Sequence, residues 1–381
     1  MGCQHRGACA GSRQERWSVL SYTVIGEPAQ VRDIMRRTDD FAPTNALTSV
    51  VPLAPATLRI LSKVRFALPP VLASATGAQH RAVRTMVGRF FTPAKVAAIE
   101  PRVRELARHR LAATSMALGQ GPVDLAEHVG KHIPPVVMAE LTGQPTPELD
   151  LLKRWSRDSL ELFWGWPDPE RQLLLAHSAA EFYVWLRQEA AAARGTSSLF
   201  GVLDAAGLSS AEVCSLGYFL VIAGQETTAQ LINTVLFRGL ESAARATTGS
   251  WAALSEPEAA RNHVRAVLAT ESSVHTWRRA ALRDTQVAGQ AIPAGAEILL
   301  ELSGRHPGQA APTAYSLAFG HGLHRCLGAK LAELETALVL EETARALPLL
   351  EPAGAPPQWL RLLSFQAPLT VTAQLSSKEF P

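Results

Sequence analysis

A glycine-rich loop around a single cysteine constrains this chain of 381 residues more than any other stretch. Residues Phe319 to Gly328 read FGHGLHRCLG, and a helical run over residues 329–347 begins directly after them. The free N–H groups of a helix start favour a thiolate, and glycines allow backbone conformations and close ligand approach that a Cβ would block. We therefore expect the loop to present Cys326 to a metal.

The surroundings of Cys326 in the sequence indicate which metal. It has no cysteine or histidine partners at zinc spacing, so a lone thiolate favours haem iron over zinc. A buried cysteine in an ordinary strand-to-helix turn is the alternative, and it explains neither the glycines nor His324. The remaining cysteines form no disulfide framework, which favours a reducing, cytoplasmic setting; they are Cys3, Cys9 and Cys214.

Composition excludes several classes of partner. The formal net charge is only +3, and Lys and Arg are scattered rather than clustered, so we expect no nucleic acid. The longest apolar stretch, around residues 216–223, is far too short to span a membrane, and residues 1–16 lack the apolar region of a signal peptide. The small basic excess is suited to docking an acidic electron donor.

Hydrophobic periodicity predicts a mainly α protein with a minor β region. We expect residues 1–18 to be disordered or a short N-terminal extension, and residues 19–381 to form a single domain. Residues 38–78 are predicted to be irregular. Helices are predicted over residues 27–37, 79–91, 94–116, 123–141 (interrupted at Pro134 and Pro135), 148–162, 170–193, 209–243 and 256–270. Strands are predicted over residues 19–25, 281–287, 290–292 and 297–302.

A second motif, Ala223 to Thr228 (AGQETT), lies inside the predicted helix over residues 209–243. A mid-helix glycine costs about 1 kcal/mol relative to alanine, so a purely structural helix would normally avoid it. We expect Gly224 to let the backbone approach a ligand, Thr227 to disturb the helical hydrogen bonds and orient water, and Glu226 to pass protons inward. The alternative is a kinked core helix whose threonine hydroxyls bond back to carbonyls.

Both motifs resemble those of the cytochrome P450 monooxygenases, and soluble bacterial members in particular. All six fixed positions of the family's haem-binding signature are present, and the acid–alcohol motif lies 99 residues earlier when counted from Thr227 to Cys326. The resemblance implies a helical prism that binds haem b, with Cys326 as the iron ligand. It also implies catalytic roles for Glu226 and Thr227, and a cofactor loop that includes Phe319, Gly320, His324 and Gly328.

The haem propionates need cationic partners if they are buried. His80 and Arg84 are four residues apart on one helical face, and this spacing matches the family's propionate-binding helix. Arg279 matches a second family position at the start of a strand, and His324 is a further donor. A solvated surface charge is the alternative for both arginines.

The chain departs from the family in three places. Alignment puts the family's Glu-x-x-Arg pair at Ala266 and Ala269, so both charges are missing. We also expect about ten residues of the family pattern to be absent between residues 307 and 319, where a second arginine of the same network would lie. We expect a network deleted as a unit and replaced by apolar packing, since a buried carboxylate without its arginine is costly. The first strand of the family pattern starts near Val19, so an N-terminal helix and strand are expected to be absent or truncated.

The resemblance implies a monooxygenase that oxidises an apolar small molecule of secondary metabolism, either free or bound to a carrier protein. It would use O2 and electrons from a ferredoxin and a ferredoxin reductase. The alternatives are a haem-binding protein with reduced catalysis that acts as a sensor or binds a partner, and an enzyme that performs desaturation or coupling. Candidate pocket residues are Phe66, Leu68, Val71, Leu72, Phe219 and Leu220, with Trp155, Phe163, Trp164 and Trp166 as a lid.

Overall fold

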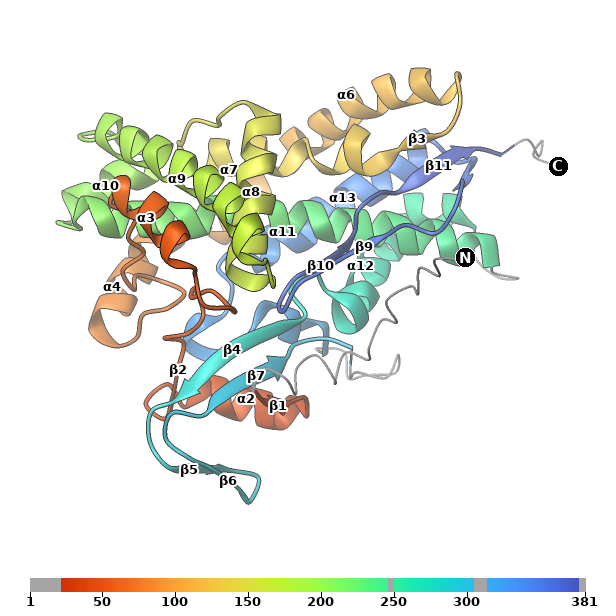
Figure 1. Cartoon of the computed structure of the whole chain (residues 1–381). Coiled ribbons are helices and arrows are strands. Elements are labelled where there is room, and N and C mark those ends of the chain that lie inside the picture. Colours follow the sequence, from red (N-terminus) through yellow and green to blue (C-terminus); the bar gives the residue numbers. More distant parts are fainter. Residues whose placement is uncertain (1–21, 246–249, 305–313, 377–381) are drawn as a thin grey trace, which may run out of the picture.

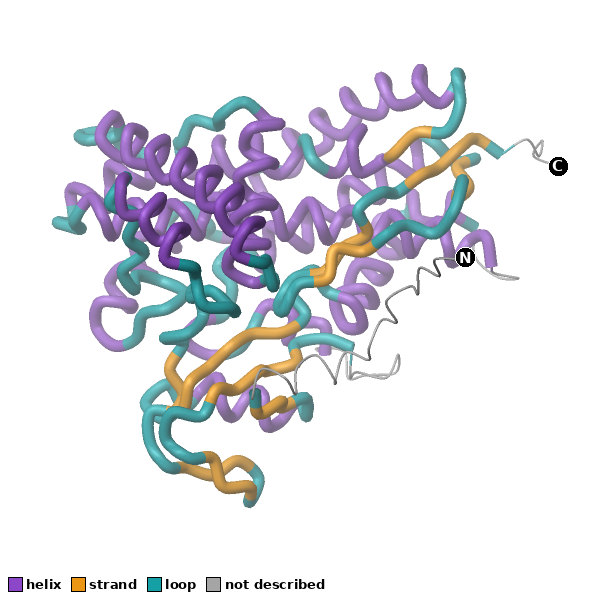
Figure 2. Tube along the Cα trace, in the orientation of Figure 1, coloured by secondary structure: helices purple, strands orange, loops and turns teal. Residues whose placement is uncertain are grey.

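The structure is a computed structural model that describes residues 22–245, 250–304 and 314–376. The prediction of a mainly helical protein with a minor β region is confirmed (Figures 1 and 2). The helices are α2 (Pro28–Arg36), α3 (Pro55–Lys63), α4 (Gly77–Gly88), α5 (Pro93–Ala98), α6 (Glu100–Leu118), α7 (Ile133–Thr142), α8 (Leu149–Trp164), α9 (Pro169–Ala192), α10 (Leu199–Ala205), α11 (Ser210–Arg245), α12 (Pro257–Glu271) and α13 (Ala329–Ala346). Short helical turns are η1 (Ala126–Gly130), η2 (Trp251–Ser255), η3 (Ala314–Phe319) and η4 (Gly322–His324). The strands are β1 (Thr23–Ile25), β2 (Phe41–Ala42), β3 (Val123–Asp124), β4 (Thr276–Ala281), β5 (Thr285–Val287), β6 (Gln290–Ile292), β7 (Glu297–Glu301), β8 (Leu350–Pro352), β9 (Trp359–Arg361), β10 (Gln366–Pro368) and β11 (Thr372–Leu375).

The central helix is α11, which has 36 residues and contacts α7, α9, α12 and α13 (Figure 1). A capping box begins it, because the backbone N–H of Ser209 donates to Glu212 Oε2 at 2.8 Å and the Glu212 N–H donates to Ser209 Oγ at 3.3 Å. Its N-terminal half packs into one apolar core with α8 and α9, and its C-terminal half into another with α6 and α13. A helix buried on several faces needs this all-round apolar surface.

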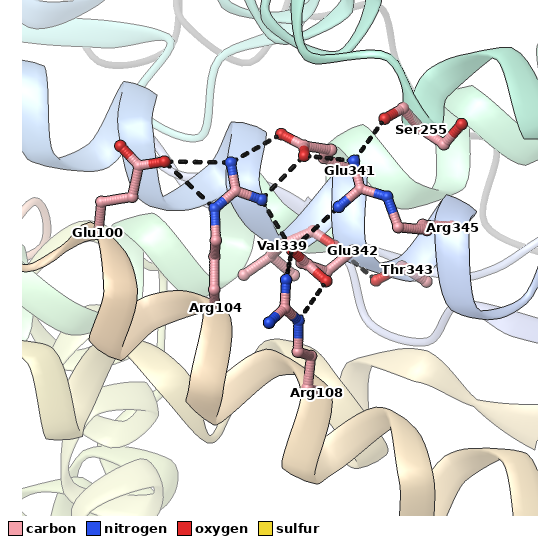
Figure 3. Close-up of polar contacts among 9 residues, drawn as sticks. All are labelled: Glu100, Arg104, Arg108, Ser255, Val339, Glu341, Glu342, Thr343 and Arg345. Carbon is pink, nitrogen blue, oxygen red and sulfur yellow. Dashed lines mark hydrogen bonds and ion pairs between the residues drawn. The ribbon is translucent and has the colours of Figure 1, made fainter.

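An ion-pair cluster joins α6 to α13 (Figure 3). Arg104 Nη1 donates to Glu341 Oε1 at 2.8 Å and to Glu342 Oε1 at 2.7 Å, while Arg345 binds both of these carboxylates and Arg108 binds Glu342. Burial alone would raise the pKa of Glu341, but hydrogen bonds from Arg104 and Arg345 outweigh it and lower that pKa. The cluster fixes the helix that follows the cysteine loop.

A four-stranded sheet has the strand order β1-β7-β4-β2, and α2 lies beside it (Figure 1). Strand β1 is parallel to β7, and β4 is antiparallel to β7 and β2. Side chains alternate between the faces of a strand, so Trp277 and Arg279 share one face of β4. Arg278 lies on the other face, where its Nη2 donates to the carbonyl of Thr48 at 2.6 Å.

Several predicted boundaries were wrong. Residues 38–78 contain α3 and β2, and α3 has the sequence signal of a proline at its first turn. Pro134 and Pro135 begin α7 rather than interrupt a helix, because a proline in the first turn gives up no intrahelical hydrogen bond. The strand expected over 281–287 is instead the end of β4 followed by the β5–β6 hairpin. The predicted extension over residues 1–18 and the shortened segment after residue 304 lie outside the described residues.

Candidate functional site

One cavity of about 230 Å³ lies between α11, α4, β4 and the cysteine loop. Of the candidate pocket and lid residues, only Leu72, Phe219 and Leu220 line it. It brings together nearly all the candidate catalytic and cofactor-binding residues. Those that line it are His80, Arg84, Thr227, Arg279, Phe319, Gly320, His324, Cys326 and Gly328. Glu226 is adjacent to Thr227 in α11 but is not among the lining residues. Their convergence from four elements gives a single candidate site.

The cysteine loop is a tight turn held by backbone hydrogen bonds. The N–H of Cys326 donates to the carbonyl of Phe319 at 2.8 Å. Gly320 and Gly322 have φ values of +71° and +67°, in the left-handed region that glycine adopts without strain. A Cβ at Gly322 would also lie 3.0 Å from the carbonyl oxygen of Met35 in α2. These glycines therefore shape the loop and seat it against α2.

The Cys326 side chain is open to the cavity while dense protein surrounds it on the other sides. Burial raises the pKa of its thiol, and the N–H of Gly328 together with the positive charges of Arg84 and Arg325 lowers it only in part. The expectation that the helix start alone would favour a thiolate is thus too simple. A metal cation bound to Sγ would remove the proton outright.

Arg279 is a buried cation without a carboxylate. It is 1% exposed, and its Nη1 donates only to the carbonyl of Arg278, at 2.8 Å. Its Nε has no partner among the described residues, and burial lowers the pKa of the guanidinium to about 10. None of the described residues that line the cavity is an aspartate or a glutamate. An anion supplied by a ligand would compensate this charge.

The two histidines and Arg84 continue this set of donors. His80 is fully buried, and neither of its ring nitrogens has a partner among the described residues. Its ring lies 4.7 Å from that of His324, whose Nε2 is 2.7 Å from the carbonyl of Ala75. Burial lowers the pKa of His324 to about 4. Arg84 Nη2 donates to the carbonyl of Arg325 at 2.6 Å, which sets α4 against the cysteine loop.

These groups fit a haem. The cavity offers one thiol, two arginines without carboxylate partners and histidine nitrogens without hydrogen-bond partners, which suit an iron atom and two carboxylates. Among the described residues there is also no group of three or more His, Cys, Asp or Glu side chains that could hold a metal ion. A single thiolate ligand is therefore the arrangement this donor set supports.

On the opposite side of the cavity, Thr227 Oγ1 donates to the carbonyl of Ala223 at 2.6 Å. The Thr227 carbonyl in turn accepts a hydrogen bond from Ser273 Oγ at 2.9 Å. Gly224 lines the cavity, but a Cβ there would lie 2.5 Å from Met138 Cε. The glycine therefore makes room for a side chain of α7, a role the sequence did not indicate.

Glu226 forms a buried ion pair that sequence reasoning missed. The carboxylate is 8% exposed, and its Oε2 accepts from Lys153 Nζ of α8 at 3.0 Å. Lys153 also donates to Gln225 Oε1 at 2.5 Å. The signal was a lysine on the otherwise buried face of α8, between Leu152 and Trp155. The pair ties α8 to the acid of the acid–alcohol motif.

The expected apolar replacement of the missing charges is wrong at the two aligned positions. Ala266 is exposed and Ala269 is half-buried, so neither fills a buried gap. Instead, Arg265 Nε donates to Glu333 Oε1 at 2.7 Å and connects α12 to α13. A different ion pair therefore joins the helices that flank the cysteine loop.

The chain resembles many known proteins of one class, although no family model matches it. Cytochrome P450 105C1 of a Streptomyces species is 30% identical over 71% of this chain and 72% of its own length. Erythromycin C-12 hydroxylase of Saccharopolyspora erythraea is 28% identical over 69% of this chain and 70% of its own length.

Solved structures of the same class have the same fold as this chain. Cytochrome P450 CREJ in complex with (4-ethylphenyl) dihydrogen phosphate superimposes with a TM-score of 0.86 at 27% identity, covering 94% of this chain and 93% of that one. The fold is the helical prism of the haem monooxygenases. The chain belongs to the cytochrome P450 family and is a monooxygenase of that family. No helix in the described ranges is long and apolar enough to cross a membrane.

Proposed function

We propose that Cys326 binds the iron of a haem b and that the protein oxidises an apolar small molecule of secondary metabolism with O2. The observation that carries this proposal is the single acid-free cavity shared by the Cys326 thiol and the unpaired cations Arg84 and Arg279. Relatives support the substrate class by their names, which include erythromycin C-12 hydroxylase and cyclomarin C epoxidase. In this proposal residues 19–381 act as one haem-binding domain in the cytoplasm.

Haem with a cysteine thiolate ligand supplies the activation of O2 for insertion into unreactive bonds. Arg84, Arg279 and His80 would bind the propionates. His324 donates from Nε2 to the Ala75 carbonyl, so its Nδ1 would donate only in the protonated ring, a form that a nearby propionate charge favours. Gly320, Gly328 and Phe319 would shape the loop that presents Cys326 to the iron. Each of these groups thus has a binding or orienting task.

Glu226 and Thr227 would manage protons on the opposite face. The Thr227 hydroxyl now donates to the Ala223 carbonyl, and rotation about its side chain would offer the same hydrogen to the cavity. Glu226 is held on the α8 side by Lys153 and lies one residue away along the chain. In this proposal Glu226 supplies protons from the α8 side and Thr227 delivers them to the cavity.

We assign electron supply to a separate ferredoxin and its ferredoxin reductase. Exposed cations surround the Cys326 side, namely Arg81 and Arg89 of the α4 region and Arg325 of the loop. The α4 sequence carries no acidic residue, so this side suits an acidic donor. Raising the ionic strength from 50 to 300 mM should then slow reduction severalfold, since exposed charges are screened. Reduction that is insensitive to salt would argue against this docking.

The test of iron ligation is the CO-difference spectrum of the haem-loaded protein. The wild type should give the band of a thiolate-ligated haem, and Cys326→Ala should abolish it. Cys214→Ala is the matched control, because that thiol is buried in α11 and does not line the cavity. A thiolate band that survives in Cys326→Ala would refute the assignment.

The alternative role as a sensor or partner-binding protein is not favoured, because the relatives are monooxygenases and the acid–alcohol pair is in place. NADPH consumption with a surrogate ferredoxin system and a tightly binding ligand distinguishes the two. The same system applied to free and carrier-bound ligands decides which form the pocket accepts.

A further inference from the structure

Four aromatic rings from distant parts of the chain pack against one another beside the cavity that Thr227 lines. They are Trp164 at the end of α8, Phe219 of α11, Trp277 of β4 and Phe365, just before β10. The Trp277 ring centroid is 6.4 Å from that of Phe219 and 6.5 Å from those of Trp164 and Phe365. The Trp164 and Phe365 rings meet edge to face at 5.0 Å. We call these four residues the aromatic wall.

The aromatic wall faces the proposed oxygen side of the haem cavity. Phe219, Trp277 and Phe365 line that cavity together with Thr227. A small annex of about 20 Å³, room for one oxygen-sized group, shares Phe219 and Phe365 with the cavity and is also lined by Trp164. The wall therefore bounds the space that remains on the Thr227 side once a haem lies over Cys326.

Charge decides which ligands this space accepts. The described residues that line the cavity and the annex include no carboxylate, so a cationic ligand would be buried without a counter-ion. The cavity arginines are Arg84, Arg279 and Arg325, and the first two are assigned to the haem propionates, while the third is exposed beside Cys326. An anionic ligand on the wall would thus find no free cation among the described residues there. The ligand that fits is uncharged.

The geometry of the rings points further to an aromatic ligand. Aromatic groups gain from offset and edge-to-face contacts with centroids several ångströms apart, and the wall already uses such contacts among its own members. Trp277 is only half-buried and borders the cavity, so one side of its indole is available to a further ring.

One polar atom of the wall lacks a partner. The Trp164 side chain is 4% exposed, and its Nε1 has no acceptor among the described residues. Buried indole N–H groups normally donate a hydrogen bond. Since Trp164 lines the annex, an oxygen on the ligand could accept that bond.

We propose, on the basis of the haem assignment above, that the aromatic wall binds an uncharged aromatic compound that carries an oxygen acceptor. Trp277 stacks on its ring, and Trp164 Nε1 donates to its oxygen. Charged aromatics and saturated rings of the same size are the excluded classes.

A matched series of probes tests the class. Haem-loaded protein that has passed the CO test is titrated at pH 7 with 4-propylphenol, 4-propylbenzoate, 4-propyl-N,N,N-trimethylanilinium and 4-propylcyclohexanol, and affinities are measured by calorimetry and by the haem absorption shift. The phenol should bind at least tenfold more tightly than each of the others. Equal or tighter binding of the benzoate, the anilinium or the cyclohexanol would overturn the proposal, while the CO band would still stand.

Substitutions at two positions test the assigned residues. Trp277→Phe should weaken 4-propylphenol binding severalfold and Trp277→Ala at least tenfold. Trp164→Phe should weaken 4-propylphenol binding about fivefold and leave propylbenzene unchanged, because only the phenol can accept the indole hydrogen. Trp185→Phe and Trp185→Ala in α9 are the controls, since that indole lies on a separate surface groove.

The same variants can contradict the proposal. Unchanged phenol affinity in Trp277→Phe and Trp164→Phe, with thiolate-type haem retained, would remove the wall from substrate binding. An equal loss for propylbenzene and 4-propylphenol in Trp164→Phe would remove the hydrogen bond. If Trp277→Ala does not fold, Trp277→Phe alone decides the stacking claim.

Discussion

Arginines in two regions of this molecule have opposite surroundings. In the cluster between α6 and α13, Arg104 lies within 2.7–3.3 Å of three carboxylates (Figure 3). In the cavity, Arg279 is more deeply buried and touches only a backbone carbonyl. A charge satisfied by its own chain contributes to folding, whereas a buried charge without a counter-ion signals a ligand. The two arginines should therefore respond oppositely to removal.

The largest expected change in stability is in the cluster between α6 and α13, where the arginines are paired with carboxylates. Arg104→Met should lower the free energy of unfolding by about 3 kcal/mol, because it leaves the buried carboxylates of Glu341 and Glu342 short of a partner. Denaturant unfolding of the haem-loaded protein measures this loss. Arg102→Met on the same helix is the control, since its partners are exposed and its loss should stay below about 1 kcal/mol. Equal losses in both variants would mean that burial of the pair does not matter.

Glu335 of α13 is the acidic counterpart of the unpaired arginines. It is 1% exposed, its Oε1 has no partner among the described residues, and burial raises its pKa to about 8, an effect that the charge of Lys153 only partly offsets. A carboxyl whose pKa is raised on folding stays protonated in the native state while the unfolded chain ionises. Stability should therefore fall as pH rises from about 4.5 to about 8, by up to about 1.4 kcal/mol per pH unit.

Glu335→Gln removes that titration and keeps the shape of the side chain. Below pH 4.5 the variant and the wild type should be equally stable, and by pH 6.5 the variant should be more stable by about 3 kcal/mol at most. Unfolding curves measured at half-unit steps of pH give the difference directly. If stability depends on pH in the same way in the two proteins, the Glu335 carboxyl has a hydrogen-bond or ionic partner in solution.

Removing Arg279, the buried cation of the cavity, is expected to change stability in the opposite direction. Arg279→Met should stabilise the haem-free protein by about 1 kcal/mol, because an apolar side chain replaces an uncompensated charge. The same change should speed the loss of haem to a scavenger protein at least tenfold. Arg278→Met is the control: it breaks the bond to the Thr48 carbonyl on the other sheet face and should leave haem loss unchanged. Destabilisation of the haem-free protein by Arg279→Met would contradict the contrast between the two regions.

The smallest effect is expected where an ion pair is half-exposed. Arg265→Ala should cost at most about 1 kcal/mol, although the pair with Glu333 joins the helices on either side of the cysteine loop. Thermal unfolding at low and high salt measures it, and a loss of several kcal/mol would place this pair with the α6–α13 cluster.

The parts of the site that sequence could predict were those encoded by local spacing. Four residues separate His80 from Arg84 on one helical face, and the loop from Phe319 to Gly328 is contiguous, so neither needed knowledge of distant contacts. The acid–alcohol motif was located in the correct helix for the same reason.

What could not be predicted depends on contacts between distant segments. The partner of Glu226 is 73 residues away on α8, and the neighbour that demands Gly224 is Met138 of α7. Arg265 and Glu333 are separated by 68 residues, so a substitute ion pair was invisible in the sequence. The strands of the C-terminal region are only three or four residues long, too short for an alternation of polar and apolar residues to be recognised.

Because Gly322 packs against Met35, the order of α2 should depend on the order of the cysteine loop. Any side chain at position 322 would push against the α2 backbone, so disorder in the loop should be transmitted to α2, which follows β1. Limited proteolysis near residues 28–37 would then cut faster when the tetrapyrrole is missing, giving a gel-based measure of loading that requires no spectroscopy.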